Sequence, residues 1–469
     1  MDTRREHDFL GEREIPADAY YGIQTCRALD NFNVTGQAIG SVPELIRALA
    51  RVKKAAALAN MRLGVLPEDV GRAIGAACDE IVAGRLHDQF PVDCIQGGAG
   101  TSTNMNANEV IANRALEIMG HGKGEYQYCH PNNHVNCSQS TNDVYPTALR
   151  LALHEKIGVF LEALTHLKRG FADKGRQFAD VIKMGRTQLQ DAVPMTLGME
   201  FAAYATTLGE DMRRLSQARR LLLEINMGAT AIGTGICAPV GYATLVTEAL
   251  RAETGLPLMR SVNLVEATWD TGVYVQVSGV LKRTATKVSK ICNDLRLLSS
   301  GPRTGLNEIN LPRLQPGSSI MPGKVNPVMP EMVNQICFDI IGKDMTVTLA
   351  SEAGQLELNV MEPVIAFCLF NGLERLGRGV RALQDRCVKG ITANAERCRS
   401  MVQNSVGIIT ALMPGLGYER AAALAREALE NEKSVYDLVL EKRLLSRERL
   451  DELLAPANML RPGRTGPLT

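Results

Sequence analysis

Five short segments of the chain are rich in hydroxyl, amide and glycine residues and carry almost no charge. They span residues 97–104, 136–143, 185–190, 227–235 and 317–327. Each lies next to a predicted helix start, where hydroxyls, amides and free backbone N–H groups can donate hydrogen bonds to an anion. Taken singly, such a segment is also typical of ordinary helix capping. Five of them in one chain favour a pocket that binds a carboxylate or a dicarboxylate.

The last segment, residues 317–327, combines two serines, a Pro-Gly turn and a single lysine. This composition is typical of a mobile loop that closes over a ligand, and Lys324 would offer its charge to a carboxylate. A nucleotide-binding loop is excluded, because Gly317 and Gly323 are separated by five residues and a valine follows the lysine. The Gly-Thr-Gly sequence at 233–235 likewise lacks the third glycine of a dinucleotide fingerprint.

Metal and hydrolase chemistry fit the sequence poorly. Four possible metal ligands lie close together in the chain: Cys129, His130, His134 and Cys137. Their spacing fits no zinc pattern, and the sequence contains no Cys-x-x-Cys pair. No Gly-x-Ser-x-Gly elbow surrounds Ser318, and the last of the seven histidines is His166. We therefore expect no metal, no cofactor and no Ser-His-Asp triad.

The composition is that of an ordinary globular protein. Among 469 residues, 52 Lys and Arg balance 51 Asp and Glu, which leaves no field to draw the chain onto nucleic acid or an anionic membrane. The charged N-terminus lacks the apolar core of a secretory signal, and the uncharged runs are broken by polar residues, Gly or Pro. We expect a soluble, cytoplasmic protein whose eleven cysteines are reduced.

Apolar residues recur with helical spacing over long stretches. Steps of 4, 4, 3, 4 and 3 residues separate Leu149, Leu153, Ile157, Phe160, Leu164 and Leu167. A second ladder runs from Leu197 to Leu215, and further helices are predicted near 268–298, 328–350 and 360–390. The aromatic content of only 4% also favours helix over sheet. Helices of about 30 residues are about 45 Å long, which suits a bundle that packs against partner chains.

The pattern predicts three domains. Residues 1–143 form a mixed, mostly helical N-terminal domain, residues 144–397 a central helix bundle that carries the loop 317–327, and residues 398–469 a small C-terminal helical domain. The first boundary lies where Gly-rich turns give way to long helices. The second lies where shorter helices with turn residues, such as those at 413–417, replace them.

The segment 317–327, Gly-Ser-Ser-Ile-Met-Pro-Gly-Lys-Val-Asn-Pro, resembles the signature loop of the aspartase/fumarase superfamily. The resemblance extends over nearly the whole chain, because further segments are similar in kind, order and spacing to other motifs of that family. These segments span 97–108, 134–143, 185–194 and 226–235. Within the superfamily, residues 8–12, 225–230 and 328–331 resemble aspartate ammonia-lyases more than class II fumarases.

The resemblance implies a fold and a reaction. The fold is mainly α, with three domains whose central long helices form a 20-helix core in a homotetramer, and each active site is shared by three chains. The reaction is the reversible elimination of ammonia from L-aspartate to give fumarate, through an aci-carboxylate intermediate and with a serine as general base. Neither a cofactor nor a metal is implied.

The resemblance also assigns roles to individual residues. Ser318 is the general base, and Asn142 faces the amino group. The β-carboxylate is held by Thr101, Ser140, Thr141 and Ser319. The α-carboxylate is held by Thr187, Lys324 and Asn326. Gln188 stands where many relatives have histidine, and we interpret it as a hydrogen-bonding contact to the substrate without acid–base work. Donors placed around the β-carboxylate would stabilise the charge that develops there.

Two alternatives remain at the level of sequence. A fumarate hydratase would use the same pocket and loop on malate. A helical scaffold protein would keep the fold without the activity. Ser318, Lys324, Asn326 and the hydroxyl segments argue against a scaffold, because it has no need of them together.

Overall fold

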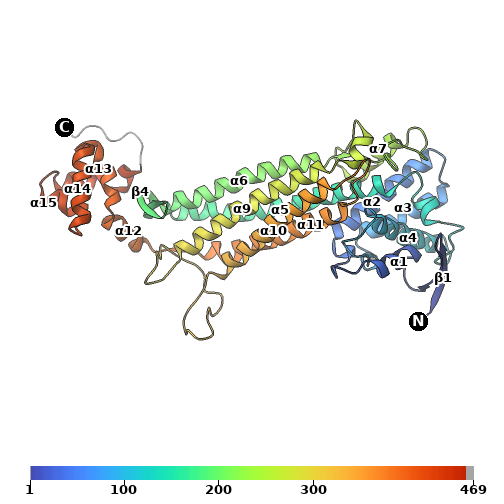
Figure 1. Ribbon diagram of the computed structural model, residues 1–469, viewed down its shortest axis with the longest axis horizontal. Coiled ribbons are helices and arrows are strands. Elements are labelled where there is room, and N and C mark those ends of the chain that lie inside the picture. The colour runs from blue at the N-terminus through green and yellow to red at the C-terminus, as the bar shows by residue number, and fades with distance from the viewer. Residues whose placement is uncertain (1, 461–469) are drawn as a thin grey trace. The chain divides into compact units, whose positions relative to one another are not determined.

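The computed structural model describes residues 2–460, and most of them are helical (Figure 1). This confirms the predicted mainly α fold. The few strands form four small two-stranded sheets and contribute little to the core. No helix in the described part of the chain is both long enough and apolar enough to cross a membrane.

Five long helices dominate the structure, and they occur where the apolar spacing predicts them. They are α5 (Thr141–Gln177), α6 (Leu197–Leu221), α9 (Gly272–Leu298), α10 (Val328–Glu352) and α11 (Glu362–Arg386). The first apolar ladder forms the buried face of α5, and Leu149, Leu164 and Leu167 have no exposed surface at all. Aromatic rings on α5 and α6 fill the space between these two helices, with Phe171 and Tyr204 packed edge to face at 5.5 Å.

The chain divides into two compact units. The first unit comprises Met1–Glu162, Asp211–Ala285 and Cys337–Gly377, and the second comprises Ala163–Glu210, Thr286–Ile336 and Arg378–Thr469. Each of the five long helices therefore begins in one unit and ends in the other. The three-domain division stays a prediction.

The first unit surrounds its share of the long helices with shorter elements. These are β1 (Thr3–Asp8), β2 (Gly11–Pro16), α1 (Ile23–Asn31), α2 (Pro43–Arg62), α3 (Glu68–Val82), α4 (Thr101–Ile118), β5 (Glu224–Ile225), α7 (Tyr242–Thr254), β6 (Met259–Arg260) and α8 (Leu264–Trp269). The core of this unit forms where α2 packs against α3 and α7 and where α3 packs against α4. Leu49, Val52 and Ile74 are completely buried there.

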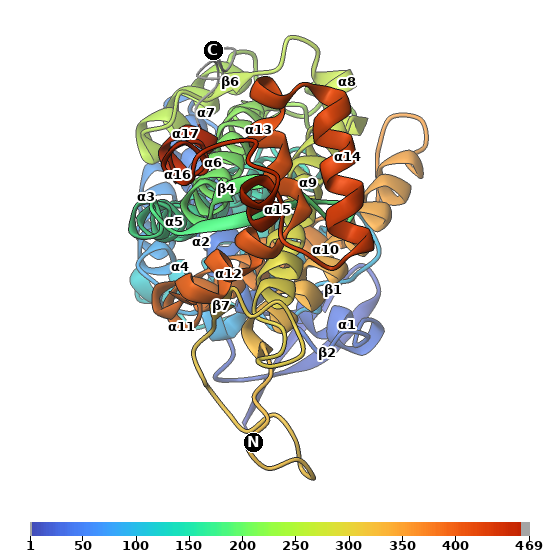
Figure 2. The same ribbon diagram turned by 90° about the vertical axis from the view of Figure 1, so that its left-hand side faces the viewer.

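The second unit contains two small sheets and the C-terminal helices. Its elements are β3 (Ile182–Thr187), β4 (Gln190–Thr196), β7 (Ile309–Asn310), β8 (Thr392–Ala393), α12 (Ala395–Asn404), α13 (Ile409–Leu416), α14 (Tyr418–Glu430), α15 (Val435–Glu441), α16 (Arg447–Leu453) and α17 (Pro456–Met459). The helices α13, α14 and α15 lie side by side (Figure 2). They share one hydrophobic cluster with α16, in which Leu412, Leu438 and Leu450 are buried.

Candidate active site

The start of α5 is held by reciprocal hydrogen bonds among Ser140, Asn142 and Asp143. The Ser140 Oγ atom accepts a hydrogen bond from the Asn142 N–H at 3.2 Å, and the Asp143 carboxylate accepts one from the Ser140 N–H at 2.9 Å. This is a capping box, which satisfies backbone donors that an isolated helix end would leave free. Because the Ser140 oxygen is used as an acceptor, its O–H remains available to donate to a ligand.

The Asn142 side chain is held in one orientation by a carbonyl from a remote segment. Its Nδ2 donates to the Ala231 carbonyl at 2.7 Å, so its Oδ1 faces away as an acceptor. Its backbone carbonyl lacks a helical partner, because Pro146, four residues later, has no N–H. Asn226 Nδ2 donates to that carbonyl instead, at 2.9 Å.

Thr141 receives a donor from the helix that follows the first predicted segment. Asn104 Nδ2 on α4 donates to Thr141 Oγ1 at 3.2 Å, and Thr141 is buried. Thr101 is the first residue of α4, one turn before Asn104, and donates from its own Oγ1 to the Gly98 carbonyl at 2.6 Å. Gly100 must be glycine, since a Cβ atom there would come within 2.5 Å of the Tyr145 ring.

A buried polar network lies against the same segment, and the sequence-based assignment missed it. Lys53 on α2 is completely buried, and its Nζ donates to Asn136 Oδ1 at 2.9 Å and to Gln139 Oε1 at 3.0 Å. Burial lowers the pKa of Lys53 to about 7, against the opposing charge of Asp143. Asn104 and a second α4 asparagine also donate to Asn136 Oδ1. The available signal was the run of asparagines on α4, which a buried helix does not otherwise tolerate.

Loop 317–327 closes on itself in the second unit. The Gly317 N–H donates to the Lys324 carbonyl at 2.8 Å, and Asn326 Nδ2 donates to the Gly317 carbonyl at 2.8 Å. A side chain at Gly317 would collide with the backbone of Lys324 and Asn326 at 2.9 Å, which explains the glycine. Asn326 thus uses its amide to close the loop, while Ser319 and Lys324 are exposed.

Ser318 occupies a position that favours negative charge on its oxygen. Its Oγ accepts hydrogen bonds from the Ile320 N–H at 3.2 Å and from the Met321 N–H at 3.0 Å. Backbone donors aimed at an oxygen stabilise the ionised form of that oxygen over the neutral one. The loop therefore supplies the kind of activation that a serine needs in order to act as a base.

Thr187 and Gln188 lie at the tip of the hairpin formed by β3 and β4. Thr187 pairs with Gln190, so Gln188 and Leu189 form a two-residue turn with φ of +55° and +62°. Such turns usually contain asparagine and glycine, because side chains disfavour positive φ. All four residues are exposed. Backbone strain of this kind is typical of functional sites.

The base of this hairpin is anchored by a buried charge cluster. Glu308 has no exposed surface and forms ion pairs with Lys183, at 2.8 Å, and with Arg186. Lys183 also pairs with Glu200 on α6 at 2.6 Å. Removing one partner of such a cluster would leave an uncompensated buried charge.

The predicted site residues therefore fall into two groups. The first unit brings together Thr101, Ser140, Thr141 and Asn142 around the start of α5. The second unit carries Thr187 and Gln188 on the hairpin, and Ser318, Ser319, Lys324 and Asn326 on the loop.

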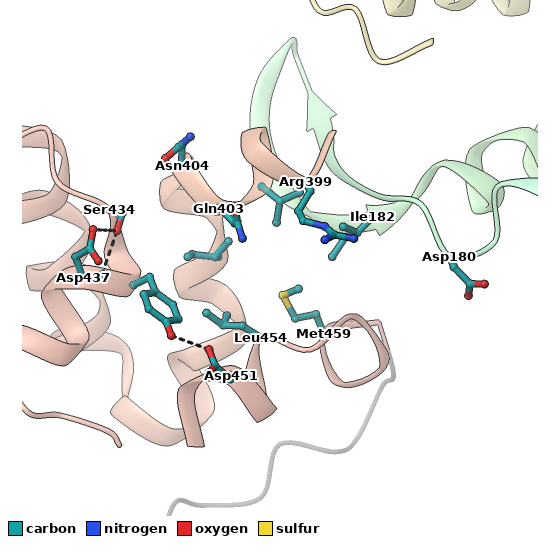
Figure 3. Close-up of a pocket in the computed structure, with 13 residues that line it drawn as sticks. Asp180, Ile182, Arg399, Gln403, Asn404, Ser434, Asp437, Asp451, Leu454 and Met459 are labelled. Atoms are coloured by element: carbon teal, nitrogen blue, oxygen red, sulfur yellow. Dashed lines mark hydrogen bonds between the residues drawn. The ribbon is translucent and has the colours of Figure 1, made fainter. Parts of the chain in front are cut away.

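Two sizeable cavities lie elsewhere. One, of about 500 Å³, is surrounded by Arg399, Gln403, Asp451 and Met459 in the second unit, where the Tyr436 O–H donates to Asp451 at 2.7 Å (Figure 3). The other, of about 620 Å³, lies beside α1 in the first unit. Neither lining contains a predicted site residue. Within residues 2–460, no group of three His, Cys, Asp or Glu side chains is placed to hold a metal ion.

Comparison with known proteins identifies the family of the chain. The sequence profile of a family described as lyase matches residues 11–342, and the profile of the fumarase C C-terminus matches residues 408–461. The structure is similar to that of a fumarate lyase:delta crystallin from Brucella melitensis bound to cobalt. The TM-score is 0.96 at 56% identity, over 98% of this chain and 100% of the other. A class II fumarase from Schistosoma mansoni gives a TM-score of 0.93 at 36% identity, over 98% and 100%.

The fold and the matching profiles define a lyase of the aspartase/fumarase superfamily. The chain is 59% identical to the aspartate ammonia-lyase of Pseudomonas aeruginosa, over 98% of this chain and 97% of that protein. It is 58% identical to that of Helicobacter pylori (98% and 98%) and 54% identical to that of Escherichia coli K12 (98% and 96%). The chain belongs to the aspartate ammonia-lyase family.

Proposed function

We propose that this protein catalyses the reversible elimination of ammonia from L-aspartate to give fumarate. The observation that carries the proposal is the identity of 54–59% to aspartate ammonia-lyases over 98% of the chain. A class II fumarase of similar structure is only 36% identical, which favours aspartate over malate as substrate.

In the proposed reaction the ionised Ser318 Oγ takes the C3 proton of aspartate and becomes a neutral hydroxyl. The electron pair of the C3–H bond moves into the β-carboxylate and forms an aci-carboxylate dianion. It then returns to form the C2=C3 double bond as the C2–N bond breaks and ammonia leaves. The two N–H donors to Ser318 Oγ support this role, because they stabilise the serine oxygen while it carries charge.

The β-carboxylate would be held by hydroxyl groups at the helix starts and in the loop: Thr101, Ser140 and Thr141, and Ser319. Ser140 and Thr141 both use their oxygens as acceptors within the protein, which leaves their O–H groups to donate to the dianion. Donors fixed before the reaction stabilise a developing charge without reorganisation. This arrangement supports binding that is stronger in the transition state than in the ground state.

The remaining residues would orient the other end of the substrate. Thr187, Lys324 and Asn326 hold the α-carboxylate, and the exposed amide of Gln188 adds a hydrogen bond. Asn142 accepts a hydrogen bond from the amino group through Oδ1, since its Nδ2 already donates to Ala231. Gln188 has no role in proton transfer, because an amide does not titrate near neutral pH.

We also propose a cytoplasmic homotetramer with active sites shared by three chains. The central helix α10 exposes large apolar side chains on one face, with Phe338 60%, Met345 61% and Leu349 60% exposed. Such a face is costly in water and suits burial against other copies of the chain. Light scattering should give a mass four times the 51.0 kDa of one chain. A monomer would contradict the shared site.

The test of the function is fumarate formation, followed by its ultraviolet absorbance, from L-aspartate and separately from L-malate. Fumarate from aspartate with stoichiometric ammonia supports the lyase. Fumarate from malate alone would support the second candidate, fumarate hydration, which is considered because a class II fumarase has a similar structure. If neither substrate gave fumarate, both proposals would be contradicted.

A further inference from the structure

Asp143 is a completely buried carboxylate to which the proposed reaction assigns no role. Its two oxygens bind different segments of the chain. Oδ1 accepts from the Ser140 N–H at 2.9 Å, whereas Oδ2 accepts from the N–H groups of Gly228 and Thr230, each at 3.0 Å. One carboxylate therefore ties the start of α5 to a turn more than 80 residues later in the sequence.

The adjacent residue makes two further bonds between the same segments. Asn142 Nδ2 donates to the Ala231 carbonyl, and Asn226 Nδ2 donates to the Asn142 carbonyl that Pro146 leaves without a helical partner. Together with the two bonds to Asp143, four hydrogen bonds join Asn142 and Asp143 to residues 226–231.

The turn at 226–231 directs two backbone N–H groups at one carboxylate oxygen. Gly228 and Thr230 have φ of +93° and +56°, and the positive value at threonine is strained. A side chain at Gly228 would come within 2.4 Å of Ala243. Backbone N–H groups that converge in this way form an anion-binding nest. In this protein the anion is the Asp143 carboxylate.

The buried charge has few neighbours that carry charge. Lys53 on α2 is the cation that faces it, and Tyr242 on α7 is a buried phenol that feels its charge. The Lys53 Nζ itself donates to Asn136 and Gln139. An asparagine in place of Asp143 would keep the volume but turn N–H groups toward N–H donors, so the ties on at least one side would be lost.

We infer that Asp143 is a positioning residue for the elimination, acting through Thr141 and Asn142. It fixes the start of α5 against residues 226–231, so that the Thr141 O–H and the Asn142 Oδ1 point to the substrate. The inference rests on the proposed function. It differs from simple helix capping, because a cap would contribute to stability and leave turnover unaltered.

The first test is Asp143→Asn in the full-length protein. We expect kcat for aspartate to fall about 100-fold, with a smaller change in KM, since the residues that Asp143 orients act mainly in the transition state. Circular dichroism and gel filtration should show an intact oligomer. A kcat within threefold of that of the unaltered protein would overturn the inference.

A matched control distinguishes a positioning role in catalysis from the general effect of altering a buried carboxylate. Glu109 on α4 is also a buried carboxylate, and it accepts hydrogen bonds from the N–H groups of Gly22, Gln24 and Thr25. Glu109→Gln should lower the melting temperature to an extent comparable with Asp143→Asn, while kcat stays within threefold. An equal loss of kcat in both variants would show that Asp143 is only structural.

A double-mutant cycle tests whether Asp143 acts through its neighbour. In an Asn142→Ala background, Asp143→Asn should lower kcat by much less than the 100-fold expected in the unaltered protein. The reason is that the Asn142 side chain, which Asp143 orients, is already absent. Strictly multiplicative losses in kcat would contradict action through Asn142.

Hydrogen exchange gives a readout that does not depend on activity. The amides of Gly228 and Thr230 should exchange at least tenfold faster in Asp143→Asn than in the unaltered protein, but not in Glu109→Gln. If the unaltered protein forms no fumarate from aspartate, the proposed function fails, while the exchange rates still decide whether Asp143 holds the turn. Unchanged exchange at both amides would overturn the inference even in an active enzyme.

A second variant covers the case in which Asp143→Asn does not fold. Asn226→Ala removes the bond to the Asn142 carbonyl and the bond that Asn226 Oδ1 accepts from Thr147 Oγ1, and it leaves the carboxylate in its nest. We expect a loss of about tenfold, again in kcat rather than KM. A fully active Asn226→Ala protein would contradict the proposal that ties to residues 226–231 align the site.

Discussion

The start of α5 and loop 317–327 carry the same kinds of residue but are held in opposite ways. Around α5, Thr141 and Asn142 bond to α4 and to residues 226–231, and the segment is largely buried. In the loop, the hydrogen bonds of Ser318 and Asn326 are made with other loop residues, and most side chains are exposed.

This difference indicates separate roles for the two regions in catalysis. Groups that stabilise charge are most effective when their orientation is fixed in advance. A base on a loop can instead approach after the substrate has bound and exclude water as it closes. We therefore expect the α5 segment to provide preorganised binding and the loop to deliver Ser318.

The largest expected effect comes from Ser318→Ala in the loop. Removal of a general base should lower kcat by about 1,000-fold or more. The melting temperature should hardly change, because an exposed loop serine contributes little to packing. Fumarate absorbance and thermal unfolding measure the two effects. An active Ser318→Ala protein would refute the assignment of the base.

Asn142→Ala in the α5 segment should lower both the activity and the stability. Loss of the acceptor for the amino group should lower kcat about 100-fold. Loss of the bond to Ala231 should lower the free energy of unfolding by about 1 kcal/mol. Denaturant titration beside steady-state kinetics would show both losses. If stability did not change, the contrast between a fixed segment and a free loop would fail.

Lys324→Ala should act mainly on binding. An exposed ammonium group that pairs with the α-carboxylate contributes similarly to ground state and transition state, so KM should rise about tenfold with a smaller change in kcat. Lys324→Arg keeps the charge and serves as the control. An unchanged KM in Lys324→Ala would count against the carboxylate role.

Activity should decline as the pH falls through about 6. Burial raises the pKa of Asp143 to about 6, against the lowering by the N–H groups of Ser140, Thr230 and Gly228 and by Lys53. Protonation below that pH weakens the ties, so kcat should fall by up to about tenfold per pH unit.

The contribution of Asp143 to stability should change with pH in the opposite direction to the activity. The folded-state pKa of Asp143 lies above its unfolded value of about 4, so the contribution of this group to stability falls as the pH rises from about 4 to 6. Loss of activity below pH 6 should therefore occur without unfolding caused by this group. An identical kcat inflection in Asp143→Asn would contradict the origin in Asp143.

The smallest expected effect is at the hairpin tip. Leu189 is 71% exposed with φ of +62°, and glycine there would relieve strain of about 1 kcal/mol. Leu189→Gly should leave kcat unchanged and raise the free energy of unfolding by up to about 1 kcal/mol, measured at fixed protein concentration. A loss of activity would show that the side chain of Leu189, and not only the turn, serves the site.

The long helices and much of the chemistry follow from local patterns in the sequence. The apolar period of 3.6 residues specifies which face of α5 and α6 is buried, and this signal is local. The residue types of loop 317–327, with two serines, a lysine and a Pro-Gly turn, predicted a loop that contacts an anion. These features depend on neighbours within about ten positions, so the chain order displays them directly.

The tertiary structure was needed to show which polar groups already have hydrogen-bond partners within the protein. Asp143 belongs to a segment that is typical of helix capping, yet its second oxygen binds Gly228 and Thr230. The Ser318 Oγ accepts hydrogen bonds from two loop N–H groups, which residue types alone did not predict. The direction of an N–H bond depends on φ and ψ, and partners remote in sequence meet only when the core packs. Residue types alone carry neither kind of information.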